Sequence, residues 1–416
     1  MQTRAVITGM GAVTPLGNNV DTFWQACLRG DSGISPITRF DTSAYATRIA
    51  AEVKDFDPLD YFEKKEVKRA DLSQQFAVAA SQQAIDDSGL DLDAIDRNRA
   101  GVVIGSGIGG IETLEQQHKK LLEAGPGRVS PFFIPMMIID MCAGLVSMRY
   151  GFHGPNYGLV SACASSSHAI LDAYRIVQRG EADLVLTGGA EAPITPISLA
   201  GFCQAKAMST HNEEPTRASR PFDRNRDGFV MGEGSAIMVV ESYDHAVKRG
   251  AHIYGEIMGG GMTGDAHHVT APHPEGLGAR LAMEMALKDA GLSADKIDHI
   301  NTHGTATGLG DIAEVRAIKA VLGDRAYKIP CNSTKSMCGH LLGAAGSAEL
   351  LTILKSMQDD VIHPTTNLDH PDPECDLDFV PHEKRAYHLD YALSNSFGFG
   401  GHNVSLVIGR VNGDGR

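Results

Sequence analysis

Short apolar runs alternate with longer stretches of helical periodicity along the whole chain. The apolar runs indicate strands over residues 5–8, 101–104, 157–161, 183–187, 235–241, 297–302, 328–331 and 404–408. The periodic stretches, in which apolar residues recur every three or four positions, indicate helices over residues 72–87, 164–179, 277–290, 311–322 and 341–358. This alternation is typical of parallel sheets covered by helices, so we expect an α/β protein.

The second half of the chain repeats the rhythm of the first. A turn-rich loop over residues 209–227 and the expected strand over 235–241 close the first series, and the second series begins near Ile253. No linker rich in proline or serine separates them. We therefore expect two closely packed, similar α/β halves, residues 1–251 and 252–416, although sequence identity between them is too low to establish a duplication.

Composition and charge narrow the class of protein and its partners. The 416 residues suffice for two or three domain-sized units, and 43% hydrophobic with 21% charged residues is near the globular average. The longest apolar stretches, such as residues 134–139, fall far short of the ~20 residues that cross a bilayer. Residues 1–4 show no leader-like pattern, so we expect a cytoplasmic protein or the mature form of an organelle protein, with no membrane partner. The net charge of -14 argues against nucleic acid as the main partner.

Cysteine and glycine usage add two further expectations. The seven cysteines extend from Cys27 to Cys375 without a CxxC pair, which argues against a disulfide framework or a zinc knuckle and favours a reducing compartment. The 46 glycines are an excess in a chain without low-complexity segments. They indicate many tight turns and close approaches of the backbone to itself or to a ligand.

Residues 105–110 form the pattern GxGxxG between an expected strand and a helix, which is the form of a dinucleotide-binding fingerprint. Glycine is abundant in this chain, however, and no strand ending in an acidic residue follows near residue 125. We therefore expect a structural turn here, with a nucleotide-dependent oxidoreductase as the less favoured alternative.

Two other segments imitate metal sites. Residues 223–228 begin like a calcium-binding EF-hand loop, but position 12 of that loop is Gly234 and two arginines lie among the supposed ligands. His267, His268 and His273 lack the spacing of a known metalloenzyme motif. We reject calcium and expect the histidines to make ordinary hydrogen bonds.

Cys163 has the sequence context of a nucleophile. It lies between the expected strand over 157–161 and the expected helix over 164–179, with small and polar neighbours on both sides. The amide groups and dipole at a helix N-terminus stabilise a thiolate, so we expect a lowered thiol pKa. The alternative is a buried cysteine that acts as a small hydrophobic residue.

Two histidines occupy a similar position in the second half. His303 and His340 each follow an expected strand through a loop of small residues, and Lys335 precedes His340 in its loop. Open α/β sheets build their active sites beyond the carboxyl ends of such strands. A thiolate with two imidazoles and a lysine suits acyl transfer followed by carbanion chemistry.

With these residues in place, the chain resembles a known family along its whole length. The matching motifs are residues 6–11 (VITGMG), 220–223 (RPFD), 232–234 (GEG) and 395–401 (NSFGFGG). They are similar to those of the β-ketoacyl-acyl-carrier-protein synthases of the thiolase superfamily, most closely the elongating type II enzymes. The resemblance implies a thiolase-like fold in which the two α/β halves form a layered α-β-α-β-α core.

The resemblance also implies roles for individual residues. The catalytic set would be Cys163, His303, His340, Lys335 and Glu314, and the oxyanion hole would be the backbone N–H groups of Cys163 and Phe399. The residues implied to bind substrate are Thr305, Thr307, Phe397, Phe399, Ile108 and Phe202, with Phe399 as a gate and Ile108 at the floor of the acyl tunnel near a dimer interface. The implied docking residues for the carrier protein are Lys64, Lys65, Lys68, Arg69 and Lys206.

The implied activity is decarboxylative condensation of an acyl chain, carried on Cys163, with malonyl-acyl-carrier protein in fatty-acid elongation. The implied partners are acyl carrier protein, acyl and malonyl thioesters and a second copy of the chain. No catalytic metal or organic cofactor is implied, although a structural monovalent cation near Asn301 and Glu349 is an expectation from the family. The alternatives are a non-catalytic partner that sets chain length and a ketosynthase of polyketide synthesis. Cys338 and His402 stand where threonine is common, which leaves the substrate preference open.

Overall fold

The computed structural model describes residues 3–411, and its centre is a mixed sheet of ten strands. The strand order is β10-β9-β13-β14-β8-β1-β7-β6-β4-β5. The strands are β1 (Ala5–Val13), β4 (Ala100–Gly105), β5 (Asn156–Leu159), β6 (Leu184–Glu191), β7 (Gly234–Ser242), β8 (Gly255–Gly264), β9 (His299–Asn301), β10 (Cys331–Asn332), β13 (Tyr391–Gly398) and β14 (His402–Gly409).

The sheet consists of two five-stranded parts with the same pattern of pairing. From β1 outward, the order β1-β7-β6-β4-β5 has two antiparallel pairs followed by two parallel pairs, and β8-β14-β13-β9-β10 has the same sequence of directions. The two parts join where β1 pairs antiparallel with β8, through Ala5 with Ile257, Val6 with Glu256 and Ile7 with Gly255. The expected two similar halves are thus present, while their boundary between residues 251 and 252 stays a prediction.

The expectation of parallel sheets was wrong for four of these strands. Strands β1, β7, β8 and β14 all run antiparallel to their neighbours. Every residue of β1 and β7 is buried and most of them are apolar, so these strands lack the alternation of buried and exposed positions. Parallel strands covered on both faces give the same pattern, and the pattern therefore does not report strand direction.

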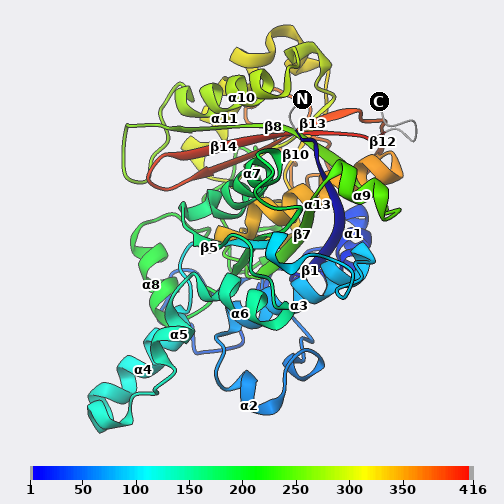
Figure 1. The fold of residues 1–416 in the computed structure, drawn as a ribbon. Coiled ribbons are helices and arrows are strands. Elements are labelled where there is room, and N and C mark those ends of the chain that lie inside the picture. The colour runs from blue at the N-terminus through cyan, green and yellow to red at the C-terminus, as the bar shows by residue number, and fades with distance from the viewer. Residues whose placement is uncertain (1–2, 412–416) are drawn as a thin grey trace.

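Helices form three layers around the two parts of the sheet, as Figure 1 shows. Helices α7 (Ser165–Gln178) and α13 (Ala345–Asp359) lie between the parts and share one apolar core with β1, β7 and β14. Helices α3 (Leu72–Ser88) and α6 (Met141–Tyr150) cover the outer face of the first part, and α10 (Leu277–Ala290) and α11 (Gly308–Leu322) that of the second. This arrangement confirms the layered α-β-α-β-α fold.

The strand β8 was not expected, because three of its residues are consecutive glycines. Their small size has a packing reason, since β8 lies directly against α10. A Cβ on Gly259 would come 2.4 Å from the backbone nitrogen of Ala290, and one on Gly261 would come 2.1 Å from the carbonyl oxygen of Ala282. Side chains at these positions would push the helix from the sheet.

A smaller unit projects from the layered body. It contains α4 (Ile111–Ala124) and α5 (Phe133–Met137), which pack together, and α2 (Lys64–Val67) lies at the same lower end of the molecule but apart from α4 in Figure 1. Its surface carries large apolar side chains, and Leu122 and Ile134 are exposed by 73% and 53%. Within residues 3–411 no helix is both long and apolar enough to cross a membrane.

Candidate active site

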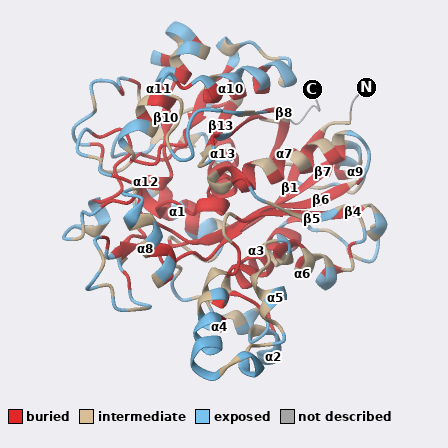
Figure 2. Ribbon diagram, turned by 90° about the vertical axis from the view of Figure 1, so that its left-hand side faces the viewer, coloured by how far each residue is buried: buried red, intermediate tan, exposed pale blue. Residues whose placement is uncertain are grey.

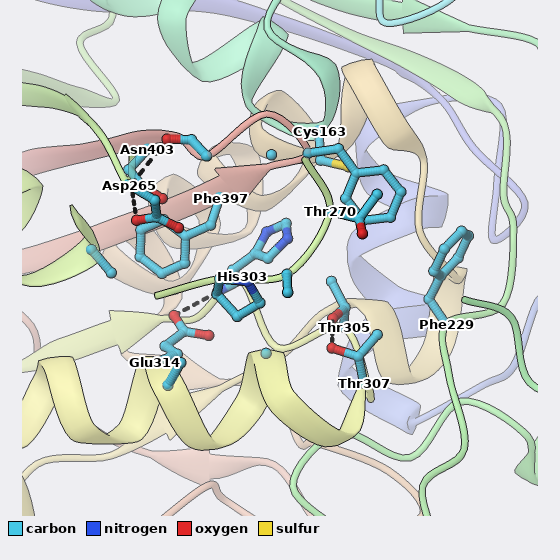
Figure 3. A pocket seen from close by; sticks show the side chains of 18 of the residues that line it. Cys163, Phe229, Asp265, Thr270, His303, Thr305, Thr307, Glu314, Phe397 and Asn403 are labelled. Atoms are coloured by element: carbon cyan, nitrogen blue, oxygen red, sulfur yellow. Dashed lines mark hydrogen bonds between the residues drawn. The ribbon is translucent and has the colours of Figure 1, made fainter. Parts of the chain in front are cut away.

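The expected nucleophile and both expected histidines line one pocket. Cys163 reaches it from the junction of β5 and α7, and His303 reaches it from the other half of the molecule (Figure 3). His340, also from that half, lines the same pocket. The pocket walls also include Phe202, Phe229, Asp265, Thr270, Thr305, Thr307, Glu314, Leu342, Phe397, Phe399 and Asn403. The structure therefore brings together residues that are separated by up to 240 positions in the chain.

Cys163 sits in a single tight turn, Ala162–Ala164, immediately before α7 begins at Ser165. Ala162 has a φ of +52°, in the left-handed region, so the backbone bends sharply before the cysteine. Gly398 of β13 lies against this bend, because a Cβ there would come 2.6 Å from the carbonyl oxygen of Ser161. The expected position of Cys163 between a strand and a helix is confirmed.

The expected lowering of the Cys163 pKa is wrong. Burial raises the pKa of the thiol to about 11, and the negative charge of Glu191 acts in the same direction. The ammonium of Lys335 and the backbone N–H groups of Phe399 and Cys163 oppose this effect by favouring the thiolate. The helix N-terminus alone does not outweigh the cost of charging a sulfur atom away from water.

His303 and His340 present uncharged rings to the pocket. Their ring centroids are 5.5 Å apart in an edge-to-face arrangement, and burial together with the charge of Lys335 holds both pKa values well below the usual range. Among residues 3–411 neither ring nitrogen of His340, nor Nδ1 of His303, has a hydrogen-bond partner. A neutral imidazole has one N–H donor, so each ring can donate to an oxygen atom placed in the pocket.

Glu314 supports the backbone on which His303 lies. Its carboxylate, on α11, accepts hydrogen bonds from the backbone nitrogens of His303 at 2.8 Å and Gly304 at 2.9 Å, and from Asn395 Nδ2 at 3.2 Å. Burial raises the pKa of Glu314 to about 7, although these donors favour its charged form. Glu314 therefore fixes the loop after β9 rather than the imidazole itself.

Lys335 also acts on the main chain of His303. Its Nζ donates to the carbonyl oxygen of His303 at 2.7 Å and forms a buried ion pair with Glu349. Both side chains are about 2% exposed. The pair brings a positive charge close to Cys163 and both histidines without a direct contact to the imidazole rings.

The expected substrate-binding residues are mostly in the pocket wall. Thr305 and Thr307 lie together, with their hydroxyl oxygens 3.0 Å apart, and the ring of Phe397 is 5.7 Å from that of His303. Phe399 and Phe202 face each other with ring centroids 6.5 Å apart. Ile108 does not line the pocket but packs in the apolar cluster that contains Cys163, Phe202 and Leu342.

The glycine-rich segment 105–110 has its amide groups occupied within the protein. The buried carboxylate of Glu191 accepts hydrogen bonds from the backbone nitrogens of Gly107 at 2.6 Å and Ile108 at 3.0 Å. A phosphate-binding loop needs these N–H groups free and directed at the ligand. The structure thus supports a structural turn and gives no support to nucleotide binding.

The two motifs that imitate metal sites have structural roles. Asp223 accepts hydrogen bonds from the backbone nitrogens of Asn225 and His370, and so holds its own loop. His268 accepts from the backbone nitrogens of Thr270 and Ala271 at 3.1 Å, beside the pocket mouth. Across residues 3–411 no group of three metal-type side chains is close enough to hold an ion.

Asn301 and Glu349 fit the expected monovalent cation. Asn301 Oδ1 and Glu349 Oε2 are buried oxygens without a hydrogen-bond partner in the described part of the chain. They lie in one network, because Asn301 Nδ2 donates to Thr352 Oγ1, which in turn donates to the carbonyl oxygen of Glu349. Oxygen ligands of this kind suit a hard cation.

The expected docking residues are at the surface but not in one patch. Lys64, Lys65 and Lys68 are exposed on and beside α2, and the guanidinium of Arg69 lies 4.5 Å from the ring centroid of Phe132. Lys206 follows α8 (Pro196–Gln204), which lies apart from α2 in both views (Figures 1 and 2). The helix α2 has only four residues, so the expected succession of two helical turns is absent.

Several pocket residues were not anticipated from the sequence. Phe229 packs edge-on against His340 with ring centroids 5.3 Å apart, Asp265 accepts from Asn403 Nδ2, and Leu342 follows His340. Glu191, which lies outside the pocket lining, was also not anticipated, because it ends an apolar strand. The only hint of Glu191 in the sequence was a single acidic residue at the end of an apolar run.

Comparison with known proteins agrees with this geometry. Residues 2–246 match the family model of the beta-ketoacyl synthase N-terminal domain, and residues 254–369 match that of the C-terminal domain. The chain therefore belongs to the β-ketoacyl synthase family, as the resemblance indicated.

Individual relatives define the position within the family. A curated protein of Synechocystis, 3-oxoacyl-[acyl-carrier-protein] synthase 2, is 53% identical over 97% of both chains. The protein of that name from Coxiella burnetii is 50% identical over 98% of this chain and 99% of its own.

Solved structures of related ketosynthases are also similar. A β-ketoacyl synthase from Burkholderia phymatum is 37% identical with a TM-score of 0.91, over 99% of this chain and 100% of the other. A ketosynthase solved with a type II polyketide acyl-carrier protein and bound to the hexaketide is 33% identical with a TM-score of 0.93, over the same shares.

Proposed function

We propose that this chain catalyses the decarboxylative condensation of an acyl thioester with malonyl-acyl-carrier protein in fatty-acid elongation. The observation that carries the proposal is the convergence of Cys163, His303 and His340 on one pocket. The relatives at 50–53% identity, named 3-oxoacyl-[acyl-carrier-protein] synthase 2, support this reaction and the acyl carrier protein as partner.

The first step is acyl transfer to Cys163. Its Sγ attacks the carbonyl carbon of the incoming thioester, and the backbone N–H groups of Cys163 and Phe399 stabilise the oxyanion that forms. The C–S bond to the carrier then breaks, and the proton lost by Cys163 ends on the released carrier thiol. The N–H groups of Phe399 and Cys163 already favour negative charge at the sulfur, which supports this role.

The second step forms the new carbon–carbon bond. Malonyl-carrier protein loses CO2, and the electron pair of the broken bond becomes an enolate. His303 and His340 donate hydrogen bonds to the thioester oxygen, which carries the developing charge. The enolate carbon attacks the acyl group on Cys163, and the thiolate that leaves takes a proton from solvent, so that β-ketoacyl-carrier protein and CO2 are the products.

Lys335 and Glu314 position His303 in this scheme. Both hold its main chain, and the charge of Lys335 also favours the thiolate of Cys163. Asn301 and Glu349 would hold the monovalent cation of the family, whose contribution would be to balance the charge buried around them.

The substrate follows the pocket from surface to interior. Thr305 and Thr307 bind the pantetheine arm, and Phe399 is the gate whose movement admits the acyl chain. Its neighbours Gly400 and Gly401 have φ of +87° and +74°, which glycine adopts without strain. Phe202 and Phe397 form walls around the acyl chain, and the acyl tunnel extends beyond this lining to Ile108 in the adjoining apolar cluster.

The carrier protein docks on the basic residues of α2 and its neighbours, Lys64, Lys65, Lys68 and Arg69, and Lys206, which follows α8 and lies apart from them, is a second point of contact. Acyl carrier proteins are acidic, whereas the net charge of this chain is -14, so attraction needs a local basic surface. The exposed ammonium groups around α2 supply one.

We further propose that the chain is a cytoplasmic homodimer. Strand β5 ends the sheet and leaves Tyr157 and Val160 exposed by 38% and 53%, and the projecting unit exposes Leu122 by 73%. An edge strand with apolar side chains favours pairing with another copy. Sedimentation velocity on the full chain should give a dimer at micromolar concentration, and a monomer there would contradict the proposal.

The alternative of a polyketide ketosynthase has support from structural relatives at 31–33% identity. The fatty-acid assignment is favoured, because the relatives of that name are 50–53% identical. A non-catalytic partner is disfavoured, because the nucleophile and both histidines are present in one pocket.

Incubation of the enzyme with acyl- and malonyl-carrier protein tests the function directly. The wild type should release CO2 and elongate the acyl chain without a nicotinamide cofactor, and Cys163→Ala should abolish elongation. Cys163→Gln should still decarboxylate malonyl-carrier protein, because the histidines remain, and adding His303→Ala or His340→Ala should suppress that release. Elongation at the wild-type rate by Cys163→Ala would overturn the proposal.

A further inference from the structure

Glu191 is a fully buried carboxylate that the reaction scheme does not use. It is the last residue of β6, and each of its oxygens accepts two hydrogen bonds. Oε1 accepts from Ser106 Oγ at 2.9 Å and from the backbone nitrogen of Ile108 at 3.0 Å. Oε2 accepts from the backbone nitrogens of Gly107 at 2.6 Å and Gly343 at 2.9 Å. All four donors are neutral, so the carboxylate is held by dipoles alone.

These donors come from two segments that meet at the carboxylate. One is the glycine-rich loop after β4, and the other is the turn Leu342–Ala344 that follows His340. A Cβ on Gly343 would come 2.5 Å from Glu191 Oε2 and 2.3 Å from the backbone nitrogen of Gly107. The two main chains can approach so closely only because both residues lack a side chain.

Each segment carries a wall of the acyl-binding region. Ile108 lies in the glycine-rich loop and packs in the apolar cluster with Phe202 and Cys163. Leu342 lies in the other segment, lines the pocket and belongs to the same cluster. Leu342 is two residues beyond His340, so the same short segment carries a residue of the pocket wall and one of the histidines.

The charge of Glu191 also reaches the nucleophile. It is one of the groups that raise the pKa of the Cys163 thiol, in opposition to Lys335. A negative charge at this position disfavours the thiolate, and its removal should make the thiolate easier to form.

We infer that Glu191 is a positioning residue that fixes the acyl-pocket wall at Ile108 relative to the turn after His340, and that its carboxylate thereby sets which acyl chains are accepted. The inference rests on the proposed condensation and adds a determinant of its acyl specificity. The backbone amides of the glycine-rich segment bind the carboxylate of Glu191 rather than a phosphate group.

The variant Glu191→Gln tests the inference with little change in shape. The glutamine amide has one acceptor oxygen, so its NH2 group loses at least one N–H hydrogen bond: that of Ile108 if it replaces Oε1, or those of Gly107 and Gly343 if it replaces Oε2. We expect kcat/KM to fall by about tenfold for long acyl-carrier substrates and by less for short ones. The pH midpoint for alkylation of Cys163 by iodoacetamide should fall by about half a unit, because a negative charge is lost.

Glu241→Gln is the matched control. Glu241 is a buried carboxylate at the opposite end of the same pair of strands, where it pairs with Leu184 of β6 and binds Thr8 and Arg249. It should alter neither the chain-length profile nor the alkylation midpoint. Ser106→Ala removes one donor to Glu191 and should shift the chain-length profile in the same direction by a smaller factor. This variant replaces Glu191→Gln as the test if Glu191→Gln does not fold.

Several outcomes would overturn the inference. Glu191→Gln or Ser106→Ala with the wild-type chain-length profile would do so, as would an equal loss for every chain length. An alkylation midpoint identical to that of the wild type would show that the charge of Glu191 does not affect the thiol of Cys163. Failure of the wild type to condense would refute the proposed function instead, and the alkylation assay would still report on Glu191, because it needs no condensation.

Discussion

Lys335 contacts His303 through the main chain and not through its imidazole. The ammonium donates to the carbonyl oxygen of His303 at 2.7 Å while it forms a buried ion pair with Glu349. The ring of His303 is therefore free to face the substrate, and burial together with the nearby positive charge lowers its pKa and keeps it unprotonated. One lysine thus fixes the loop and disfavours the imidazolium form.

Replacing Lys335 with alanine should damage both stability and catalysis. The change leaves the carboxylate of Glu349 buried without its partner, which should cost about 3–5 kcal/mol in the free energy of unfolding. Release of CO2 from malonyl-carrier protein should fall at least about 100-fold. Adding Glu349→Ala should recover much of the stability, measured by urea denaturation, but not the activity. Wild-type decarboxylation by the single variant would exclude a role for Lys335 in positioning His303.

The acyl-chain preference should respond to the size of residue 108. Ile108 belongs to the same apolar cluster as Cys163, Phe202 and Leu342, and by the proposed function a larger side chain there takes space from the acyl chain. Ile108→Phe should lower kcat/KM for long acyl-carrier substrates about tenfold or more and leave short ones nearly unchanged, whereas Ile108→Ala should not shorten the accepted chains. The profiles can be measured in competition assays with mixed chain lengths. Identical profiles for both variants would place Ile108 outside the acyl-binding region.

Charge reversal on α2 should weaken the encounter with the carrier protein. Lys64 and Lys65 are exposed, whereas Arg69 packs on Phe132 and its replacement would also disturb packing. Lys64→Glu/Lys65→Glu should raise KM for carrier-bound substrates several-fold at low salt, and less at high salt because of screening. Small pantetheine thioesters should react normally.

The control for this surface is Lys288→Glu/Lys384→Glu, which makes the same change in net charge at exposed positions away from α2. It should leave KM for carrier-bound substrates within about twofold, because long-range charge is screened over roughly 10 Å. Equal effects of the two double variants would show that net charge, and not the α2 surface, governs the encounter.

Two buried histidines outside the pocket should make the fold sensitive to acid. Burial lowers the pKa of His299 to about 3 and that of His363 to about 4, below the 6.5 of an exposed histidine. Between pH 6.5 and 4 the unfolded chain takes up protons that the folded chain does not, so stability falls as the pH falls.

The variant His299→Gln isolates one of these groups, because a glutamine amide can still donate to Asn332 Oδ1 as the imidazole does. From pH 7 to pH 5 it should lose about 2 kcal/mol less stability than the wild type in urea titrations. His118→Gln, at an exposed position, should keep the wild-type pH dependence. An unchanged pH dependence in His299→Gln would mean that His299 is protonated in the folded protein.

The local parts of the site could be predicted from the sequence. Cys163 at a strand-to-helix junction, and His303 beyond a strand end, depend on patterns within about ten residues. Glu191 accepts a hydrogen bond from Gly343, which is more than a hundred residues away in the chain, and Lys335 pairs with Glu349 of α13. Both contacts depend on how these segments pack in the fold, and no local sequence pattern indicates them. The raised pKa of Cys163 was missed for the same reason, because the burial that causes it comes from the assembled pocket.

The pairing of β1 with β8 makes the first strand of the chain an interior strand. Ala5, Val6 and Ile7 each face a residue of β8 on one side, and on the other side β1 pairs with β7. Deletion of the chain up to and including Ile7 would therefore remove the pairing between β1 and β8 and expose strand edges in both halves. The deleted residues lie far from the pocket residues in sequence. Loss of these few residues would leave the packing of helices such as α7 and α13 to keep the nucleophile beside its two histidines.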